Sequence, residues 1–193
     1  MHRPEGESNT SFSAVHSTSI IYSAKAEKGI SDLSEGVCQK LPKKSLSFEF
    51  VTFNDMISAL ELIFSPSAAS VILFTAAVKC GAQWHDRMKK KFGTTEEALR
   101  ILSEAKKEEN WGKLSFRDVD FVNGSGKIIV EDAFETVARK AEKGRETSQP
   151  CCNFLRGFLS GFLSELFEKS ITVTEEKCAG KGDEHCEFTF KRG

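Results

Sequence analysis

The sequence predicts an α+β fold in which helices pack on an antiparallel sheet and a C-terminal helix and hairpin form a zinc clasp. Three observations predict it. Apolar residues recur at helical spacing over much of 55–109. Two regions, 113–134 and 171–191, each contain two strand-like segments split by turn-forming residues, which predicts hairpins. A strongly apolar helix, 151–168, lies between them, with cysteines at its start and in the second hairpin.

The first 45 residues form an N-terminal extension that we expect to be partly disordered. Residues 1–20 are rich in serine, threonine, glycine and charge, and they offer little apolar surface to bury. Residues 21–41 contain helically spaced apolar residues, which predict a short amphipathic helix before Pro42. Residues 46–193 are expected to form a single folded domain.

The folded domain is predicted to open with a strand and a helix. Apolar and polar residues alternate at the start, which is typical of a half-buried strand, and the apolar ones are Leu46, Phe48 and Phe50. Asn54 or Asp55 is expected to cap a helix that runs to about Phe64.

Two further helices are predicted before the first hairpin. The triplet Ser65-Pro66-Ser67 ends the preceding helix and starts a longer one that runs to about Phe92. Thr94 and Glu97 have the spacing of a capping box, which predicts a third helix over 95–109.

The first hairpin is expected to pair residues 113–122 with residues 127–134. The intervening Asn123-Gly124-Ser125-Gly126 contains glycines that tolerate positive φ, as a tight turn requires. Apolar residues change parity within the first of these strands, and a bulge near Arg117–Asp118 would reconcile the two halves.

The helix over 151–168 is apolar around more than half of its circumference, wider than the stripe of a one-sided surface helix. Pro150 precedes it at a position that suits the first residue of a helix. Gly157 and Gly161 lie on one face and allow another backbone to come close. The helix is either a central core helix or one that packs on one side and lines a pocket on the other.

The terminal hairpin is expected to pair 171–178 with 185–191, and its turn brings Cys178 and Cys186 together. Two such thiolates, with a thiol at the preceding helix start and a carboxylate of the strand, suit a four-coordinate zinc ion. A hairpin disulfide and unrelated buried thiols are the alternatives. The N-terminal residues contain no apolar signal segment, so we expect a reducing, cytoplasmic location, which disfavours a disulfide.

Composition limits the classes of partner. The formal net charge is −1, which favours neither nucleic acid nor an anionic membrane surface, and no apolar segment is long enough to span a bilayer. The chain contains 16 phenylalanines but 1 tyrosine, so its aromatic surface carries few hydrogen-bonding groups. Either these rings fill a core, or some of them line a cavity for an apolar guest.

The C-terminal third, CNFLRGFLSGFLSELFEKSITVTEEKCAGKGDEHCEF, resembles the vinyl-4-reductase domain family. The shared pattern is a cysteine, a helix with two glycines four apart, a strand that ends in glutamate, and two more cysteines. The family includes effector-sensing domains of aromatic-responsive transcriptional activators. The resemblance implies a fold related to ligand-binding domains of nitric-oxide signalling and to Golgi transport particle subunits. Residues 46–150 follow the family's order of elements loosely, and 1–45 lie outside it.

The resemblance also implies a set of metal ligands, because aromatic sensors of this family bind structural zinc through this pattern. It selects Cys152 over Cys151 and Glu175 over Glu176, with intervals of 23, 3 and 8 residues along the chain. The implied zinc ligands are Cys152, Glu175, Cys178 and Cys186.

One departure concerns the ligand. Phenol sensors of the family hold the ligand hydroxyl with a histidine and a tryptophan that have no counterpart here, since Val130 stands at the expected tryptophan position. We therefore expect a less polar or larger guest, bound by a non-catalytic sensor or carrier domain that resembles homodimeric relatives. The candidate pocket residues are Trp84, Trp111, Phe134, Phe154, Phe158 and Phe162.

Two other functions stay open. An enzyme that reduces a vinyl group of a tetrapyrrole would need a source of hydride or electrons, but no G-x-G-x-x-G follows a predicted strand. His85 lies beside Trp84 and Asp86 on one helix, where adjacent residues do not face each other. A protein–protein scaffold resembling transport-complex subunits is the second alternative, in which Cys80 could carry an acyl chain.

Overall fold

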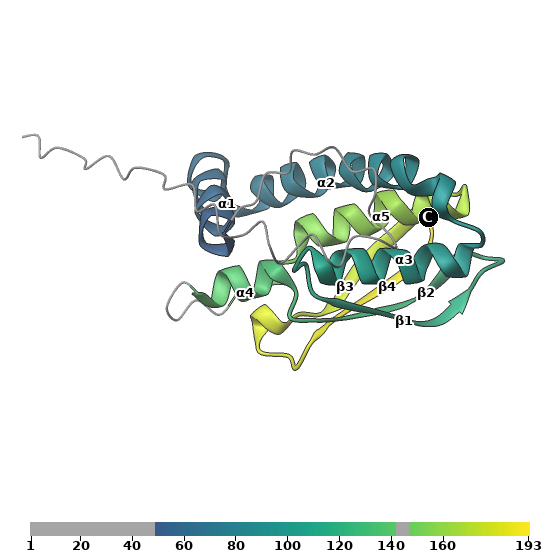
Figure 1. Ribbon diagram of the computed structural model, residues 1–193. Coiled ribbons are helices and arrows are strands. Elements are labelled where there is room, and N and C mark those ends of the chain that lie inside the picture. Colours follow the sequence, from purple (N-terminus) through teal and green to yellow (C-terminus); the bar gives the residue numbers. More distant parts are fainter. Residues whose placement is uncertain (1–48, 142–146) are drawn as a thin grey trace, which may run out of the picture. The chain divides into compact units, whose positions relative to one another are not determined.

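The computed structural model describes residues 49–141 and 147–193, and Figure 1 shows its helices and strands. The elements are α1 (Phe50–Phe64), α2 (Pro66–Met88), the 3₁₀ turn η2 (Lys89–Lys91), α3 (Thr95–Glu108), β1 (Lys113–Asp120), β2 (Ser125–Glu131), α4 (Phe134–Ala141), α5 (Asn153–Phe167), β3 (Ile171–Lys177), the 3₁₀ turn η3 (Ala179–Lys181) and β4 (Cys186–Arg192). The α+β class and the antiparallel sheet are therefore confirmed. The predicted extension, its helix over 21–41 and the predicted strand residues 46–48 lie outside the described residues.

The first helix begins earlier than the sequence predicts. Phe50, expected in a strand, opens α1, and Asn54 is a buried residue inside the helix rather than its cap. A tertiary contact favours the helix, because Phe53 packs on two rings that are distant from it in the sequence. Its ring centroid lies 5.0 Å from that of Phe134 and 6.0 Å from that of Phe154. Burial of this helical face outweighs a short alternating pattern that also suits a strand.

The predicted helix starts after Ser65 and Thr94 are confirmed, whereas α2 ends at Met88, four residues before the predicted end. Ser65 has a φ of 82° between α1 and α2, and its hydroxyl accepts a hydrogen bond from the Ala68 amide at 3.4 Å. At the start of α3 the Thr94 hydroxyl accepts from the Glu97 amide at 3.1 Å. The Glu97 carboxylate accepts from the Gly93 amide, one residue before the position that a capping box uses.

The sheet has the strand order β1-β2-β4-β3, and every pair is antiparallel. The register of β1 and β2 shifts between Arg117 and Asp120, where Asp118 has a φ of 50°, so the predicted bulge is confirmed. The turn lies earlier than expected, because β2 already begins at Ser125 and ends at Glu131.

One face of the sheet carries the core. In β3 the residues Ile171 and Val173 are buried while Thr172 and Thr174 are exposed, and the β4 residues on the same face include the buried Phe188. Figure 1 shows the helices gathered on a single side of the sheet, with α5 between the sheet and α2. None of the helices in the described part of the chain is long and apolar enough to cross a membrane.

The helices α2 and α5 touch through their backbones. A Cβ atom added at Gly157 would lie 2.3 Å from the carbonyl oxygen of Phe74, and one added at Gly161 would lie 2.0 Å from that of Val78. Gly81 of α2 makes the same kind of contact from the other side, since a Cβ atom added there would lie 2.0 Å from the carbonyl oxygen of Phe158. The predicted close approach at the two glycines of α5 is confirmed.

The helix α4 is not predicted by the sequence patterns. They predict a strand up to residue 134 and no helix directly after it, but Phe134–Ala141 is helical. Phe134, Val137 and Ala138 follow helical spacing and could have indicated it. Arg139 of α4 forms an ion pair with Glu61 of α1 and so joins the two helices.

We expect Gly161→Ala to destabilise the domain by about 3 kcal/mol, because the new methyl group would push α2 away from α5. Denaturant unfolding would measure the change. Gly93→Ala is the matched control, since its Cβ would meet only the flexible end of the Glu97 side chain. Equal stability of the two variants would contradict this account of the helix contact.

Candidate metal centre and aromatic cluster

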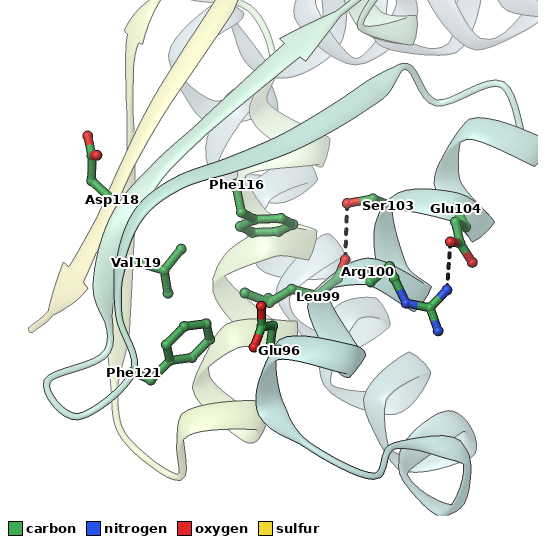
Figure 2. Close-up of a pocket in the computed structure, with 9 residues that line it drawn as sticks. All are labelled: Glu96, Leu99, Arg100, Ser103, Glu104, Phe116, Asp118, Val119 and Phe121. Atoms are coloured by element: carbon green, nitrogen blue, oxygen red, sulfur yellow. Dashed lines mark hydrogen bonds and ion pairs between the residues drawn. The ribbon is translucent and has the colours of Figure 1, made fainter.

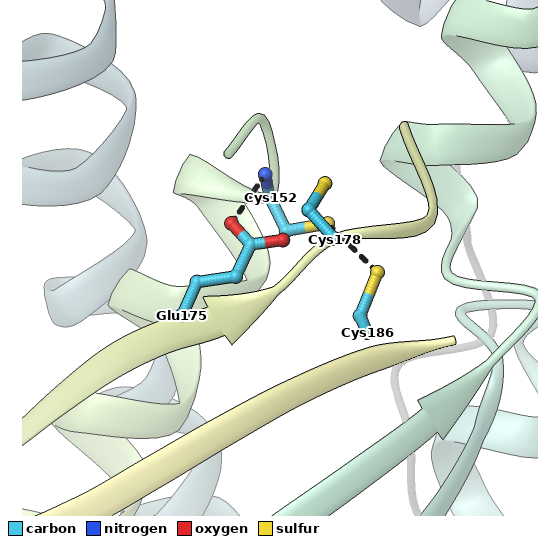
Figure 3. Close-up of side chains that lie close together, drawn as sticks. All are labelled: Cys152, Glu175, Cys178 and Cys186. Carbon is cyan, nitrogen blue, oxygen red and sulfur yellow. Dashed lines mark hydrogen bonds between the residues drawn. The ribbon is translucent and has the colours of Figure 1, made fainter. Parts of the chain in front are cut away.

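The four predicted metal ligands come together at one end of the sheet. Cys152 lies just before α5, Glu175 in β3, Cys178 directly after β3, and Cys186 at the first residue of β4. One donor atom from each side chain lies within 4.8 Å of all the others (Figure 3). The three thiols are fully buried, and the glutamate is 9% exposed. This group could hold a metal ion.

The sulfur atoms are spaced as ligands rather than as a disulfide. The Sγ atoms of Cys152 and Cys186 lie 3.6 Å apart, and all three cysteines are free. Thiolates bound tetrahedrally to one ion of zinc's size would lie roughly 3.8 Å apart, whereas a disulfide bond is about 2.0 Å long. The disulfide alternative is therefore excluded for this structure.

The Glu175 carboxylate has unused bonding capacity that points to a cation. Its Oε2 accepts a hydrogen bond from the Cys152 amide at 3.0 Å, but its buried Oε1 has no hydrogen-bond partner. Burial, and then the negative charge of Cys178, raise the pKa of Glu175 to about 8. A metal ion would give the orphaned oxygen a partner and would lower this pKa, so the donor set fits a metal.

The thiols of the cluster are not equivalent. Contacts from Cys151, Cys152 and Cys186 lower the pKa of Cys178. Contacts from the neighbouring thiols, followed by burial, hold the pKa of Cys152 well above its usual range. Ligands must lose their protons to bind a metal, so metal and protons compete for this group.

The turn between β3 and β4 presents the two later cysteines. The Cys178 amide donates to Asp183 at 2.8 Å, and the Ala179 amide donates to the Cys186 sulfur at 3.4 Å. Gly182 has a φ of 101°, which explains why a glycine suits this turn.

The start of α5 differs from the prediction. Pro150 is not its first residue, because α5 begins at Asn153, three residues later. Glu135 of the unpredicted helix α4 caps α5 instead. Its carboxylate accepts hydrogen bonds from the amides of Phe154, at 3.0 Å, and Leu155, at 2.8 Å. No local sequence signal links Glu135 to this helix end, since the capping residue comes from another element.

A fourth sulfur lies beside the cluster. The Sγ of Cys151 is 3.6 Å from that of Cys178, and the side chain is 5% exposed. It is not part of the group whose donor atoms all lie within reach of one another. The geometry thus distinguishes Cys152 from Cys151.

The six predicted pocket residues form a single aromatic cluster between α2, α4 and α5. The ring centroids of Trp111 and Phe158 are 4.9 Å apart, and those of Trp111 and Phe134 are 5.2 Å apart. Phe154 contacts both Trp111 and Phe134. Trp84 continues the cluster through its contacts with Phe158 and Phe162.

A lysine that the sequence analysis missed lies within this cluster. Lys106 of α3 is 2% exposed, and its ammonium group lies 4.0 Å from the ring centroid of Trp111. It also lies 4.5 Å from the Phe158 ring and 5.0 Å from the Trp84 ring. In the sequence, Lys106 stands among charged residues at the end of a helix, so no pattern distinguishes it from its solvated neighbours.

Two surface pockets lie away from the cluster. One, of about 560 Å³, is a groove between α3 and β1, where Leu99 faces Phe116 and Phe121 (Figure 2). The other, of about 380 Å³, lies where Pro66 and Arg139 approach residues 147–153. None of the six predicted residues lines either of these two pockets, so the role of the six residues in binding a ligand stays a prediction.

A protein-family model matches the region that contains the four predicted metal ligands. Residues 130–192 match the model of the vinyl-4-reductase domain. The match runs from the end of β2 through β4 and contains all four predicted ligands. The resemblance to the vinyl-4-reductase family is thereby confirmed for this part of the chain.

Curated relatives align over short segments. An uncharacterized protein of Methanocaldococcus jannaschii, MJ0855, is 32% identical over 85 residues, which are 41% of this chain and 36% of that protein. A second one, MJ0150, is 42% identical over 40 residues, which are 21% of this chain and 23% of that protein. The alignments thus span only about a quarter to a third of these relatives.

Solved structures share the fold over most of the chain. The phenol-responsive sensory domain of the transcription activator PoxR with phenol has a TM-score of 0.71 at 19% identity, covering 89% of this chain and 92% of that one. A vinyl-4-reductase family protein from Methanocaldococcus jannaschii has a TM-score of 0.56 at 20% identity, with coverages of 78% and 85%. A trafficking protein particle complex subunit 3 from Naegleria fowleri, covalently bound to palmitic acid, has a TM-score of 0.54 at 14% identity, with coverages of 75% and 92%.

Removal of the Glu135 cap is expected to destabilise the end of α5 that carries Cys152. Glu135→Ala leaves one buried and one partly buried amide without an acceptor, at a cost of about 3 kcal/mol. Glu135→Gln keeps one acceptor oxygen and should lose less. Hydrogen exchange at Phe154 and Leu155, with thermal unfolding, would measure both effects. Unchanged exchange in Glu135→Ala would show that the cap is unimportant.

Proposed function

We propose that residues 46–193 form a non-catalytic sensor or carrier domain that binds a small hydrophobic or aromatic molecule in an internal pocket. The observation that carries this proposal is the aromatic cluster. It joins α2, α4, α5 and the turn before β1, and it includes both tryptophans of the chain. The pocket residues are those predicted from the sequence, with Phe53 added by its contacts with Phe134 and Phe154. Two proteins of the same fold, whose structures contain phenol and palmitic acid, support the proposal.

The metal of the cluster is proposed to be a structural zinc ion. Three thiolates and a carboxylate fill four-coordinate zinc, which leaves no open position for a substrate. Their combined charge would leave the site with a net charge of about −2, which is unfavourable for Lewis-acid catalysis. The ion would instead hold the start of α5 against β3 and β4, since its ligands come from these three places.

We further propose that the protein forms a homodimer and lies in the cytoplasm. A homodimer is supported by apolar side chains that α1 exposes, of which Leu62 is 88% and Ile63 69% exposed. The free thiols of the described cysteines suit a reducing compartment such as the cytoplasm. The N-terminal extension, 1–45, is proposed to lie outside the ligand-binding domain.

The scaffold function is the second candidate. It is favoured by the same exposed apolar residues of α1, by the exposed Val71 and Ile72 of α2, and by the fold shared with the trafficking subunit. The enzyme alternative gains no comparable support. Gly124 lies in the turn between β1 and β2, so the glycine-rich segment joins two strands and does not precede a helix that could bind a dinucleotide.

Purified protein is expected to contain about one zinc ion per chain, and Cys186→Ser should lose both the metal and thermal stability. Removal of one ligand opens the site and weakens zinc binding by orders of magnitude. Elemental analysis and thermal unfolding would measure the two losses. Cys151→Ser is the control and should keep the metal, because its sulfur lies outside the four-atom group. Equal metal content in all three proteins would refute the ligand set.

Toluene and indole are expected to raise the unfolding temperature of the metal-loaded protein, because they bind the folded domain only. Phe154→Ala should weaken the binding of both compounds by about tenfold. This loss combines one aromatic contact, worth about 1 kcal/mol, with the apolar area that the ring buries. Phe121→Ala, at an exposed ring away from the cluster, is the control. If neither compound binds, or if Phe154→Ala and Phe121→Ala bind the two compounds equally well, the pocket does not lie in the aromatic cluster.

A further inference from the structure

Lys106 gives the aromatic cluster a buried positive charge. Its ammonium lies over the faces of three rings, at 4.0 Å from Trp111, 4.5 Å from Phe158 and 5.0 Å from Trp84. The side chain is 2% exposed. Ring faces attract a cation, but they do not replace the anionic partner that a buried charge needs.

The partner of Lys106 lies at the edge of the cluster. Glu109 accepts a hydrogen bond from the ammonium at 2.6 Å, and the Glu109 side chain is 38% exposed. An ammonium has three N–H donors, and among the described residues Glu109 provides the one oxygen acceptor for them. The charge is thus held by a carboxylate that is partly solvated and can move away, while the rings keep the ammonium in place.

We propose that the ligand is an aromatic carboxylate, whose ring packs within the cluster and whose carboxylate pairs with Lys106 in place of Glu109. This inference rests on the proposed binding function and names the class of ligand. A neutral guest that displaced Glu109 would leave a buried ammonium without an anion, which is costly, whereas an anionic guest restores the pair. The site therefore selects guests that combine a ring with an acid group.

The binding of benzoate, benzamide and toluene to the metal-loaded protein tests this proposal. Both tryptophans of the chain contact the ammonium, so tryptophan fluorescence reports binding, and calorimetry gives the affinities. Benzoate should bind about tenfold tighter than benzamide or more, the effect of a charge-assisted hydrogen bond in a buried site.

Three variants separate charge from packing. Lys106→Met has a similar volume and should remove the preference for benzoate while it still binds toluene. Lys107→Met, at an exposed neighbour on α3, should leave the preference unchanged. Glu109→Gln removes the competing carboxylate and should tighten benzoate binding by several-fold. If Lys106→Met does not fold, the change in benzoate affinity caused by Glu109→Gln tests the proposal instead.

The outcomes distinguish this proposal from the proposed function beneath it. Equal binding of benzoate and benzamide, a preference that persists in Lys106→Met, or weaker benzoate binding in Glu109→Gln overturns the charge selection but leaves an aromatic pocket. Binding of none of the three compounds overturns both.

Discussion

The described fold depends on how the buried N-terminal end of α5 satisfies its hydrogen-bonding groups. The first amides of a helix have no partners within the helix, and burial makes unpaired amides costly. Here two carboxylates from other elements serve this end: Glu175 of β3 accepts from the Cys152 amide, and Glu135 of α4 accepts from those of Phe154 and Leu155. These bonds set the position of Cys152 and the direction of the helix that follows it.

The direction of α5 then determines two features that are distant from each other in the sequence. On one side, Gly157 and Gly161 let the helix lie against the backbone of α2. On another, Phe158 reaches the rings of Trp84 and Trp111. The helix therefore joins the candidate metal centre at its start to the aromatic cluster along its length. A metal ion at the cysteines would stabilise the same helix end that the two carboxylates hold.

The aromatic cluster and Lys106 illustrate opposite physical demands. Rings without hydroxyl groups favour a dry interior, but an ammonium in such an interior must keep a counter-charge. The structure meets both demands by leaving the ammonium over ring faces and its partner, Glu109, at the surface. Burial lowers the pKa of Lys106, and the contact with Glu109 opposes that shift. A polar group at this place distinguishes the cluster from an ordinary apolar core.

The sequence by itself determined the features that depend on local patterns: the α+β class, the break at Ser65, the cap at Thr94, the bulge near Asp118, and the glycine face of α5. The family pattern also determined which cysteines and which glutamate converge. Only the tertiary structure decided that Phe50 belongs to a helix, that Phe134–Ala141 forms α4, and that Glu135 caps α5. It alone placed Lys106 among the rings. The reason is that turns, caps and periodicity act over a few residues, whereas these last features arise from contacts between elements that are far apart in the chain.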